Sequence, residues 1–193
     1  MSSKSTKAQL AATLKNMMRT QDLDHITIEE LTKQAGVTRN TFYYHFTDIN
    51  DLLKWVFEQE IGQPMRQHAQ FDEWQSAYRL LLTYITDNRE FCIASFHSVG
   101  RDLLEQVLYD FAFQLTTSVV DDVDAHLPKQ LHDDIGDFFG LAIVAQVTFW
   151  LRNGMQESSD RLIQRADIML HGAIKNAVKN GRDVYGYYEV DPH

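Results

Sequence analysis

The sequence contains little of what marks several common protein classes. One cysteine and three prolines occur among 193 residues, and there is no run of about eighteen apolar residues. The single cysteine, Cys92, excludes an intrachain disulfide, and the N-terminal MSSKSTKAQL segment lacks the apolar core of a signal peptide. We therefore expect a cytoplasmic protein that does not span a membrane and does not depend on disulfides.

Sequence motifs for catalysis or metal binding are also absent. The chain has no glycine-rich phosphate loop, no G-x-S-x-G segment and no Cys/His nucleophile motif. Its eight histidines include no pair at metal-ligand spacing on one predicted helix. Cys92 lies in an apolar stretch, which favours a small core residue over a reactive thiol. These absences predict a protein that is not an enzyme and needs no metal or cofactor.

The net charge of −9 argues at first against nucleic acid as a partner. Its distribution points the other way, because residues 1–47 hold six basic and four acidic residues. The first 47 residues therefore carry +2 and the remainder carries −11. A mildly basic head on an acidic body fits a DNA-binding protein whose body faces away from the phosphates. Ordinary surface scatter of charge is the alternative interpretation.

Helical periodicity dominates the apolar pattern and predicts an all-α protein of about nine helices. Thr27 and Glu30 have the spacing of a capping box, and Thr38 and Asp48 are good N-caps. The first four helices are expected at about 6–20, 28–36, 39–46 and 49–61, with Gly62 and Pro64 ending the fourth. Two short helices joined by a tight turn containing glycine are typical of a helix-turn-helix.

Longer helices are expected in the second part of the chain. A second capping-box pair, Asp72 and Gln75, opens this part, and Pro128 separates two long helices. The predicted helices cover about 72–85, 89–98, 102–127, 131–153 and 159–180, the last ending at Gly181. We predict a DNA-binding domain at 1–62 and a ligand-binding and dimerisation domain at 63–193.

The third predicted helix carries the strongest functional signal. At about 100° per residue, Phe42 and Phe46 share one face and should point into the core of the head. The outward face then carries side chains that nearly all donate hydrogen bonds, and Tyr44 lies opposite the phenylalanines. These residues are Thr38, Arg39, Asn40, Thr41, Tyr43, Tyr44 and His45. Such a face suits the major groove of DNA, and two tyrosines half-buried against the body are the alternative.

The stretch ITIEELTKQAGVTRNTFYYHFTDINDLL closely resembles the signature of the TetR family of transcriptional regulators. The resemblance covers about the first 60 residues. It implies base and phosphate contacts at Thr38, Arg39, Asn40 and Thr41, and contacts to the DNA backbone and nearby bases at Tyr43, Tyr44 and His45. It also implies a phosphate contact at Thr27.

Many family members carry lysines where this chain has Thr47 and Ile49. The Thr47 hydroxyl and a backbone N–H at the helix start can still hold a phosphate, although the positive charge is missing. Affinity for DNA is therefore expected to be modest or to depend on a coregulator.

The segment FFGLAIVAQVTFWLRNGMQES resembles the dimerising helix of the TetR branch that includes the dihydroxyacetone-kinase operon activators. That branch responds to protein partners as well as to small molecules. The residues themselves form two apolar stripes along one helix, which predicts contacts with its own domain and with a second subunit. The stripes are Leu131, Ile135, Phe138, Ala142, Ala145 and Phe149, and Phe139, Ile143, Val147 and Trp150. A helix wholly buried in a monomer is the alternative.

Aromatic residues of the middle helices predict an effector pocket at Trp74, Tyr78, Phe96, His97 and Phe111, with plain core packing as the alternative. Together these features predict a regulator that binds a palindromic double-stranded DNA operator as a homodimer. A small-molecule effector or a protein coregulator would control it. The competing hypothesis is a protein-binding adaptor or coregulator-dependent activator with weakened DNA binding, which the missing lysines and the charge of −9 favour.

Overall fold

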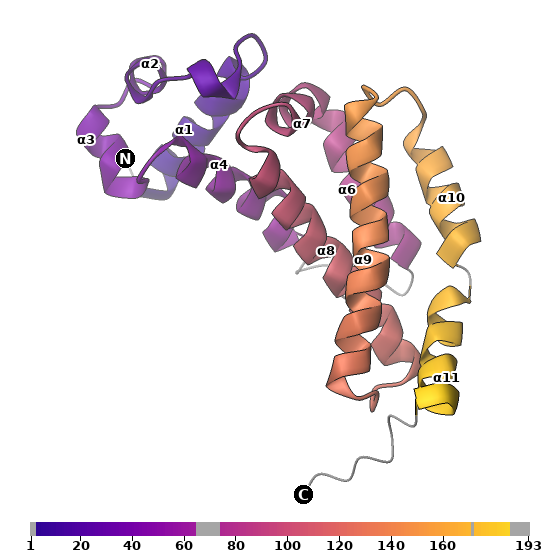
Figure 1. Ribbon diagram of the computed structural model, residues 1–193. Coiled ribbons are helices and arrows are strands. Elements are labelled where there is room, and N and C mark those ends of the chain that lie inside the picture. Colours follow the sequence, from indigo (N-terminus) through magenta and orange to yellow (C-terminus); the bar gives the residue numbers. More distant parts are fainter. Residues whose placement is uncertain (1–2, 65–73, 171, 186–193) are drawn as a thin grey trace, which may run out of the picture. The chain divides into compact units, whose positions relative to one another are not determined.

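The computed structural model describes residues 3–64, 74–170 and 172–185, and these residues form helices and no strand (Figure 1). The predicted all-α fold is confirmed. The chain divides into two compact units, residues 1–64 with 85–107 and residues 65–84 with 108–193. The boundary between a DNA-binding domain and a ligand-binding and dimerisation domain, expected after Gly62, stays a prediction.

Unit 1 is built mainly from short helices. They are α1 (Ser3–Met17), η1 (Leu23–His25), α2 (Ile28–Gln34), α3 (Arg39–His45), α4 (Ile49–Phe57), η2 (Glu58–Gly62) and α7 (Arg89–Phe96). Side-chain caps begin α2, α3 and α4. The capping box predicted at Thr27 and Glu30 is confirmed in both directions. The Thr38 hydroxyl accepts from the Thr41 N–H at 3.1 Å, and the Asp48 carboxylate from the Asp51 N–H at 2.8 Å. Each cap satisfies a donor that the first turn leaves unpaired.

The core of unit 1 joins these helices around fully buried aliphatic and aromatic side chains. Leu14, Leu31 and Phe42 are each 0% exposed. Phe57 of α4 packs against Phe91 of α7, with ring centroids 5.4 Å apart. Cys92 is buried beside Phe91, as predicted, and burial raises the pKa of its thiol to about 12.

Gly62 does not end the fourth helix as predicted, because the backbone is helical as far as Pro64, and the residues directly after Pro64 lie outside the described ranges. Residues Glu58–Gly62 form a π-helical turn in which the Gln63 N–H donates to the Glu58 carbonyl. Ile61 is fully buried in this turn. Burial of an apolar side chain outweighs the penalty of about 1 kcal/mol for a helical glycine.

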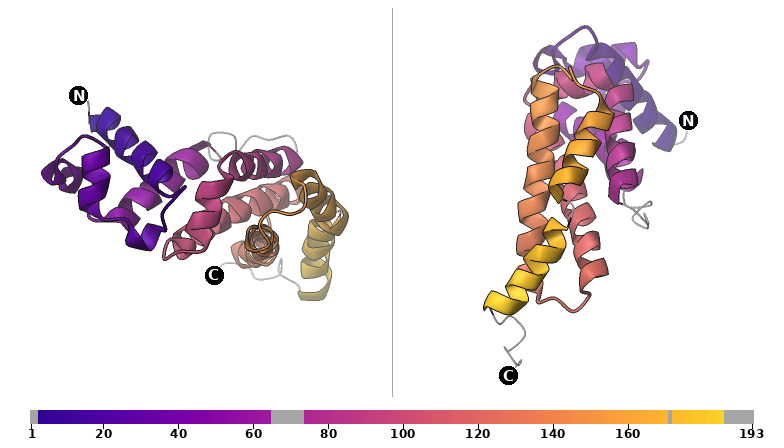
Figure 2. Two further views of the ribbon diagram at one scale, coloured as in Figure 1. Left: turned by 90° about the horizontal axis from the view of Figure 1, so that it is seen from above. Right: turned by 90° about the vertical axis from the view of Figure 1, so that its right-hand side faces the viewer.

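Unit 2 is built from longer helices. These are α6 (Trp74–Asp87) and α8 (Arg101–Val123), which extend across the boundary between the units, and α9 (Lys129–Arg152), α10 (Ser159–Leu170) and α11 (Ala173–Tyr185). α10 and α11 lie along α9 in Figure 1 and in the right-hand view of Figure 2. The Asp72–Gln75 capping pair cannot be followed, because Asp72 lies outside the described residues.

The single helix predicted over residues 159–180 is two helices, separated at Gly172. Gly172 has a φ of +72°, in the left-handed region that glycine adopts without a steric penalty. Gly181 does not end the last helix as predicted, and α11 continues to Tyr185. A Cβ at Gly181 would lie 2.2 Å from Leu131 Cδ2. Glycine at this position lets the Leu131 side chain of α9 pack closely against α11.

α9 meets the length and composition criteria for a membrane-crossing helix, as core helices of soluble proteins also do. In the described structure, Ile143, Val147, Trp150 and Leu151 of α9 are at most 4% exposed. Its first half contributes to a core cluster with α8 and α11 through Leu131 and Ile135. This packing favours α9 as a core helix.

Candidate nucleic-acid interface and effector cavity

α3 presents the face that its sequence predicts. Phe42 is 0% and Phe46 3% exposed, whereas Tyr44 is 82% and Tyr43 53% exposed. The predicted rotation of the helix about its axis is therefore confirmed. The alternative of two tyrosines half-buried against the body does not hold for Tyr44.

The other predicted DNA-contacting residues of α3 surround Tyr44. Arg39 and Asn40 are exposed, and His45 is half-buried with its ring edge-on to Tyr44 at a centroid distance of 4.9 Å. The hydroxyls of Thr38 and Thr41 lie 2.9 Å apart. The face thus brings a guanidinium, a carboxamide, hydroxyls and an imidazole together within residues 38–45, a donor-rich surface that can contact base edges and phosphates.

Acidic side chains contact several of these donors. The Arg39 guanidinium lies 3.7 Å from the Glu29 carboxylate. The Thr27 hydroxyl donates to Glu30 Oε2 at 2.8 Å. Hydrogen bonds from the Thr27 hydroxyl and backbone N–H lower the pKa of the Glu30 carboxyl. A phosphate that binds at Arg39 or Thr27 must therefore compete with a carboxylate of the same chain.

The start of α4 shows the same competition. The Thr47 N–H donates to Asp51 Oδ2 at 3.0 Å, which places a carboxylate beside the residue whose hydroxyl is expected to hold a phosphate. Asp48 and Asp51 therefore both engage N–H groups at this helix start. Ile49, which stands where many family members have lysine, is half-buried. Asp51 was missed in the sequence, although its position three residues after the Asp48 cap repeats the capping-box spacing.

Basic residues of the head make contacts within unit 1. Lys7 Nζ lies 5.1 Å from the Phe46 ring centroid and 5.8 Å from that of Trp55. Lys15 Nζ lies 2.5 Å from the Glu60 carboxylate, and Arg19 Nε lies 2.8 Å from that of Glu90. The charge of +2 at residues 1–47 is thus partly neutralised by acidic residues of unit 1 that lie later in the chain.

α9 exposes a band of apolar side chains. Phe138 is 71%, Leu141 55% and Phe149 59% exposed, and Ala142 and Ala145 lie exposed between them. On the neighbouring α10, Ile168 and Met169 are 65% and 67% exposed. Leu131 and Ile135, predicted in the same stripe as Phe138, are buried in unit 2. The structure therefore splits that stripe into an inward and an outward part.

Of the five aromatic residues predicted as an effector pocket, three belong to unit 2 and two to unit 1, and the ring centroids of Trp74 and Tyr78 lie 6.4 Å apart. Trp74 lines a cavity of about 300 Å³ in unit 2. Tyr78 is fully buried and its hydroxyl lies 3.4 Å from Gln146 Oε1, while burial raises its pKa. Phe111 is 6% exposed in unit 2. Phe96 and His97 belong to unit 1, where the Arg101 guanidinium lies 4.6 Å from the Phe96 ring centroid.

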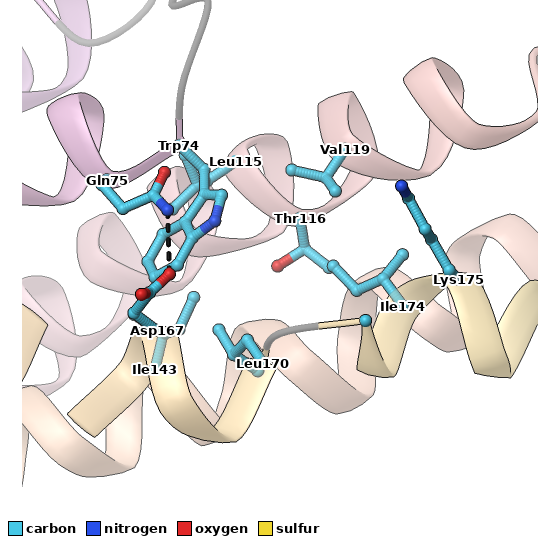
Figure 3. A pocket seen from close by; sticks show the side chains of 11 residues that line it. Trp74, Gln75, Leu115, Thr116, Val119, Ile143, Asp167, Leu170, Ile174 and Lys175 are labelled. Carbon is cyan, nitrogen blue, oxygen red and sulfur yellow. Dashed lines mark hydrogen bonds between the residues drawn. The ribbon is translucent and has the colours of Figure 1, made fainter. Parts of the chain in front are cut away.

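The cavity beside Trp74 is lined by α6, α8, α9, α10 and α11 (Figure 3). Its walls are mainly apolar, and Gln75, Thr116, Asp167 and Lys175 supply polar groups. The Gln75 amide donates to Asp167 Oδ1 at 2.9 Å. The sequence pattern indicates Gln75 only as a cap partner and does not indicate Asp167, because the two residues lie 92 positions apart. Among the described residues, no three His, Cys, Asp or Glu side chains form a group that could hold a metal ion.

Two family models match separate parts of the chain. Residues 10–56 match the family described as bacterial regulatory proteins, tetR family. Residues 72–172, over half of the chain, match a family described as a transcriptional regulator C-terminal region. These matches identify a transcription regulator with an N-terminal DNA-binding domain and a C-terminal ligand domain, and not an enzyme.

The chain is 28% identical over 86 residues to the HTH-type dhaKLM operon transcriptional activator DhaS of Lactococcus lactis. This alignment covers 45% of the chain and 46% of the relative, so it spans about half the length of that curated protein.

Two solved structures share the fold. That of dihydroxyacetone kinase operon activator DhaS has a TM-score of 0.72 and 23% identity, and covers 89% of this chain and 97% of that one. The structure of NalD, the secondary repressor of the MexAB-OprM multidrug efflux pump in Pseudomonas aeruginosa, has a TM-score of 0.58 and 17% identity. It covers 91% of this chain and 97% of the NalD chain.

Proposed function

Because the chain belongs to the TetR family of transcriptional regulators, we propose that it binds a palindromic operator as a homodimer through α3. An effector or partner at the C-terminal domain controls this binding. The observation that carries the proposal is the exposed, donor-rich face of α3, anchored by the buried Phe42 and Phe46. Acting on bacterial DNA, the protein works in the cytoplasm.

The proposed roles follow from the chemistry of each side chain. Arg39 and Asn40 carry the groups that pair with guanine and adenine edges in the major groove. Hydroxyls and imidazole reach phosphates and nearby bases. The proposed DNA-contacting set is Thr27, Thr38, Arg39, Asn40, Thr41, Tyr43, Tyr44, His45 and Thr47.

The exposed apolar band of α9 supports a dimer. Three large apolar side chains lie exposed on one face of α9, and Ile168 and Met169 of α10 are exposed as well, so water hydrates these surfaces unfavourably. Ala142 and Ala145, near the middle of the band, leave room for close approach of two helices. Asp134 and Asp137 lie toward one end and Arg152 toward the other. Two-fold antiparallel pairing would bring the basic end of one copy near the acidic end of the second.

The experiment combines DNA footprinting on the DNA upstream of the protein's own gene with light scattering in solution. We expect a two-fold symmetric footprint whose half-sites lie about 34–36 Å apart or a multiple of that spacing. Light scattering should report a dimer at micromolar concentration. An asymmetric footprint or a monomer would contradict the proposal.

A coregulator-dependent activator is the second candidate. The carboxylates that contact Arg39, Thr27 and the Thr47 N–H favour it, because they weaken DNA binding by the isolated dimer. The name of the Lactococcus relative, an operon activator, agrees with this direction of control. Transcription from the upstream promoter in a strain lacking the gene tests the direction of control: it rises without a repressor and falls without an activator.

A further inference from the structure

The cavity of unit 2 has polar groups at two positions and apolar walls between them (Figure 3). Trp74 and Gln75 at the start of α6 lie beside Asp167 of α10, and Lys175 of α11 lies at the other end of the lining residues. Leu115, Ile143 and Ile174 are among the apolar lining residues. The volume of about 300 Å³ suits a small organic molecule.

The two charged side chains of the lining differ in their access to water. Asp167 is half-buried, whereas Lys175 is exposed. Solvent and salt screen the exposed ammonium more strongly than a half-buried carboxylate. The negative charge therefore dominates the electrostatic field felt by an occupant of the cavity.

The remaining groups around Asp167 complement a cation. One carboxylate oxygen accepts the Gln75 amide hydrogen bond, which fixes the orientation of the acid. The Trp74 indole beside it offers an aromatic face, the ring type that attracts cations most strongly. Thr116, the other polar lining residue, donates its hydroxyl proton to the Ala112 carbonyl at 2.8 Å.

We propose that this cavity binds a small organic cation, with an ammonium group at Asp167 and Trp74 and an apolar body against α8, α9 and α11. This assignment rests on the proposed function and names the chemical class of its effector. Asp167 directly precedes Ile168 and Met169, the exposed apolar residues of α10. A cation held here therefore acts on a helix of the proposed dimer surface.

The test is calorimetric titration of the full-length protein, without DNA, against three probes of similar size and different charge. The probes are phenethylammonium, 2-phenylethanol and 3-phenylpropionate. Phenethylammonium should bind most tightly, and Asp167→Asn should weaken its binding by about tenfold or more, the effect of losing a charge-assisted hydrogen bond. The affinity for the uncharged 2-phenylethanol should change little in the Asp167→Asn variant. Trp74→Ala should weaken phenethylammonium binding, with Trp74→Phe retaining more affinity.

Asp160→Asn is the matched control, because Asp160 is an acid of the same helix that pairs with Arg79 and does not line the cavity. It should leave phenethylammonium affinity unchanged. Equal or tighter binding of 3-phenylpropionate, unchanged cation affinity in a folded Asp167→Asn variant, or no heat with any probe at millimolar concentration would each overturn the assignment. Footprinting separates it from the proposed function: cation binding without DNA binding refutes only the latter.

Discussion

The exposed faces of α3 and α9 differ in chemistry, although buried aromatic side chains anchor both helices. α3 exposes tyrosines, hydroxyls, a carboxamide and a guanidinium above the buried Phe42. α9 exposes phenylalanines, leucine and alanines above the buried Trp150. A donor-rich face can satisfy a hydrated, charged ligand such as DNA, whereas an apolar face gains free energy only when another apolar surface covers it. This difference supports the proposals that α3 binds DNA and that α9 binds a second copy of the chain.

The largest expected effect concerns the anchor of α3. Phe42→Ala should lower the free energy of unfolding by about 3–5 kcal/mol, because it removes a fully buried aromatic ring and leaves a cavity. Chemical denaturation of the variant measures this loss. A loss below about 1 kcal/mol would show that α3 is not held by this side chain.

One charged side chain on the exposed apolar face of α9 should disrupt the proposed dimer. Phe149→Glu should weaken dimerisation by about 2–4 kcal/mol, because a two-fold interface would bury the new carboxylate in each copy. Sedimentation over a range of concentrations measures the dimer dissociation constant. Val99→Glu is the control, since Val99 is a 63% exposed apolar residue of unit 1 and does not belong to α9. Equal effects of the two variants would count against α9 as the dimer surface.

A smaller effect is expected from adding a positive charge near the proposed DNA-binding face. Ile49→Lys should add one phosphate contact per subunit at the start of α4. The slope of log affinity against log salt should then steepen by roughly 1.8 per dimer, on specific and random DNA alike. Affinity measured at several salt concentrations, together with thermal stability, checks this. An unchanged slope in a stably folded variant would show that this helix end does not face DNA.

The smallest expected effect comes from the ion pair beside α3. Glu29→Gln removes the carboxylate 3.7 Å from Arg39, and both side chains are exposed, so the pair contributes about 0–1 kcal/mol. DNA affinity should rise by up to this amount, while the melting temperature stays nearly constant. A fall in affinity would mean that Glu29 orients Arg39 for binding instead of competing with DNA.

Local sequence patterns predict much of the head and less of unit 2. The rotation of α3 follows from Phe42 and Phe46 four positions apart, and the cap of α2 follows from Thr27 and Glu30 three apart. These features depend on neighbours within one helical turn, which a sequence displays directly. The position of Thr47 beside Asp51 was equally local and could have been predicted.

The outcomes at Gly172 and Gly181 show where sequence reasoning fails. Gly172 separates two helices through its positive φ, whereas Gly181 lies inside a helix because Leu131 packs on it. Glycine thus interrupts the helix at one position and lies within a helix at the other. The packing partner at Gly181 is Leu131, 50 positions away in the sequence. The cavity is non-local in the same way, since Gln75 and Asp167 meet only in the folded unit. Chain position grouped Phe96 and His97 with Trp74, but they lie in the other unit.

Operator binding by Tyr44→Ala tests most directly the central claim that the outward face of α3 reads DNA. Tyr44 is 82% exposed, so its removal leaves no core cavity. Affinity for the operator should fall by about 1–3 kcal/mol per subunit, the contribution of one good groove contact, while the melting temperature stays near that of the unmodified protein. Unchanged operator affinity, or a melting temperature lowered as much as by Phe42→Ala, would contradict the account.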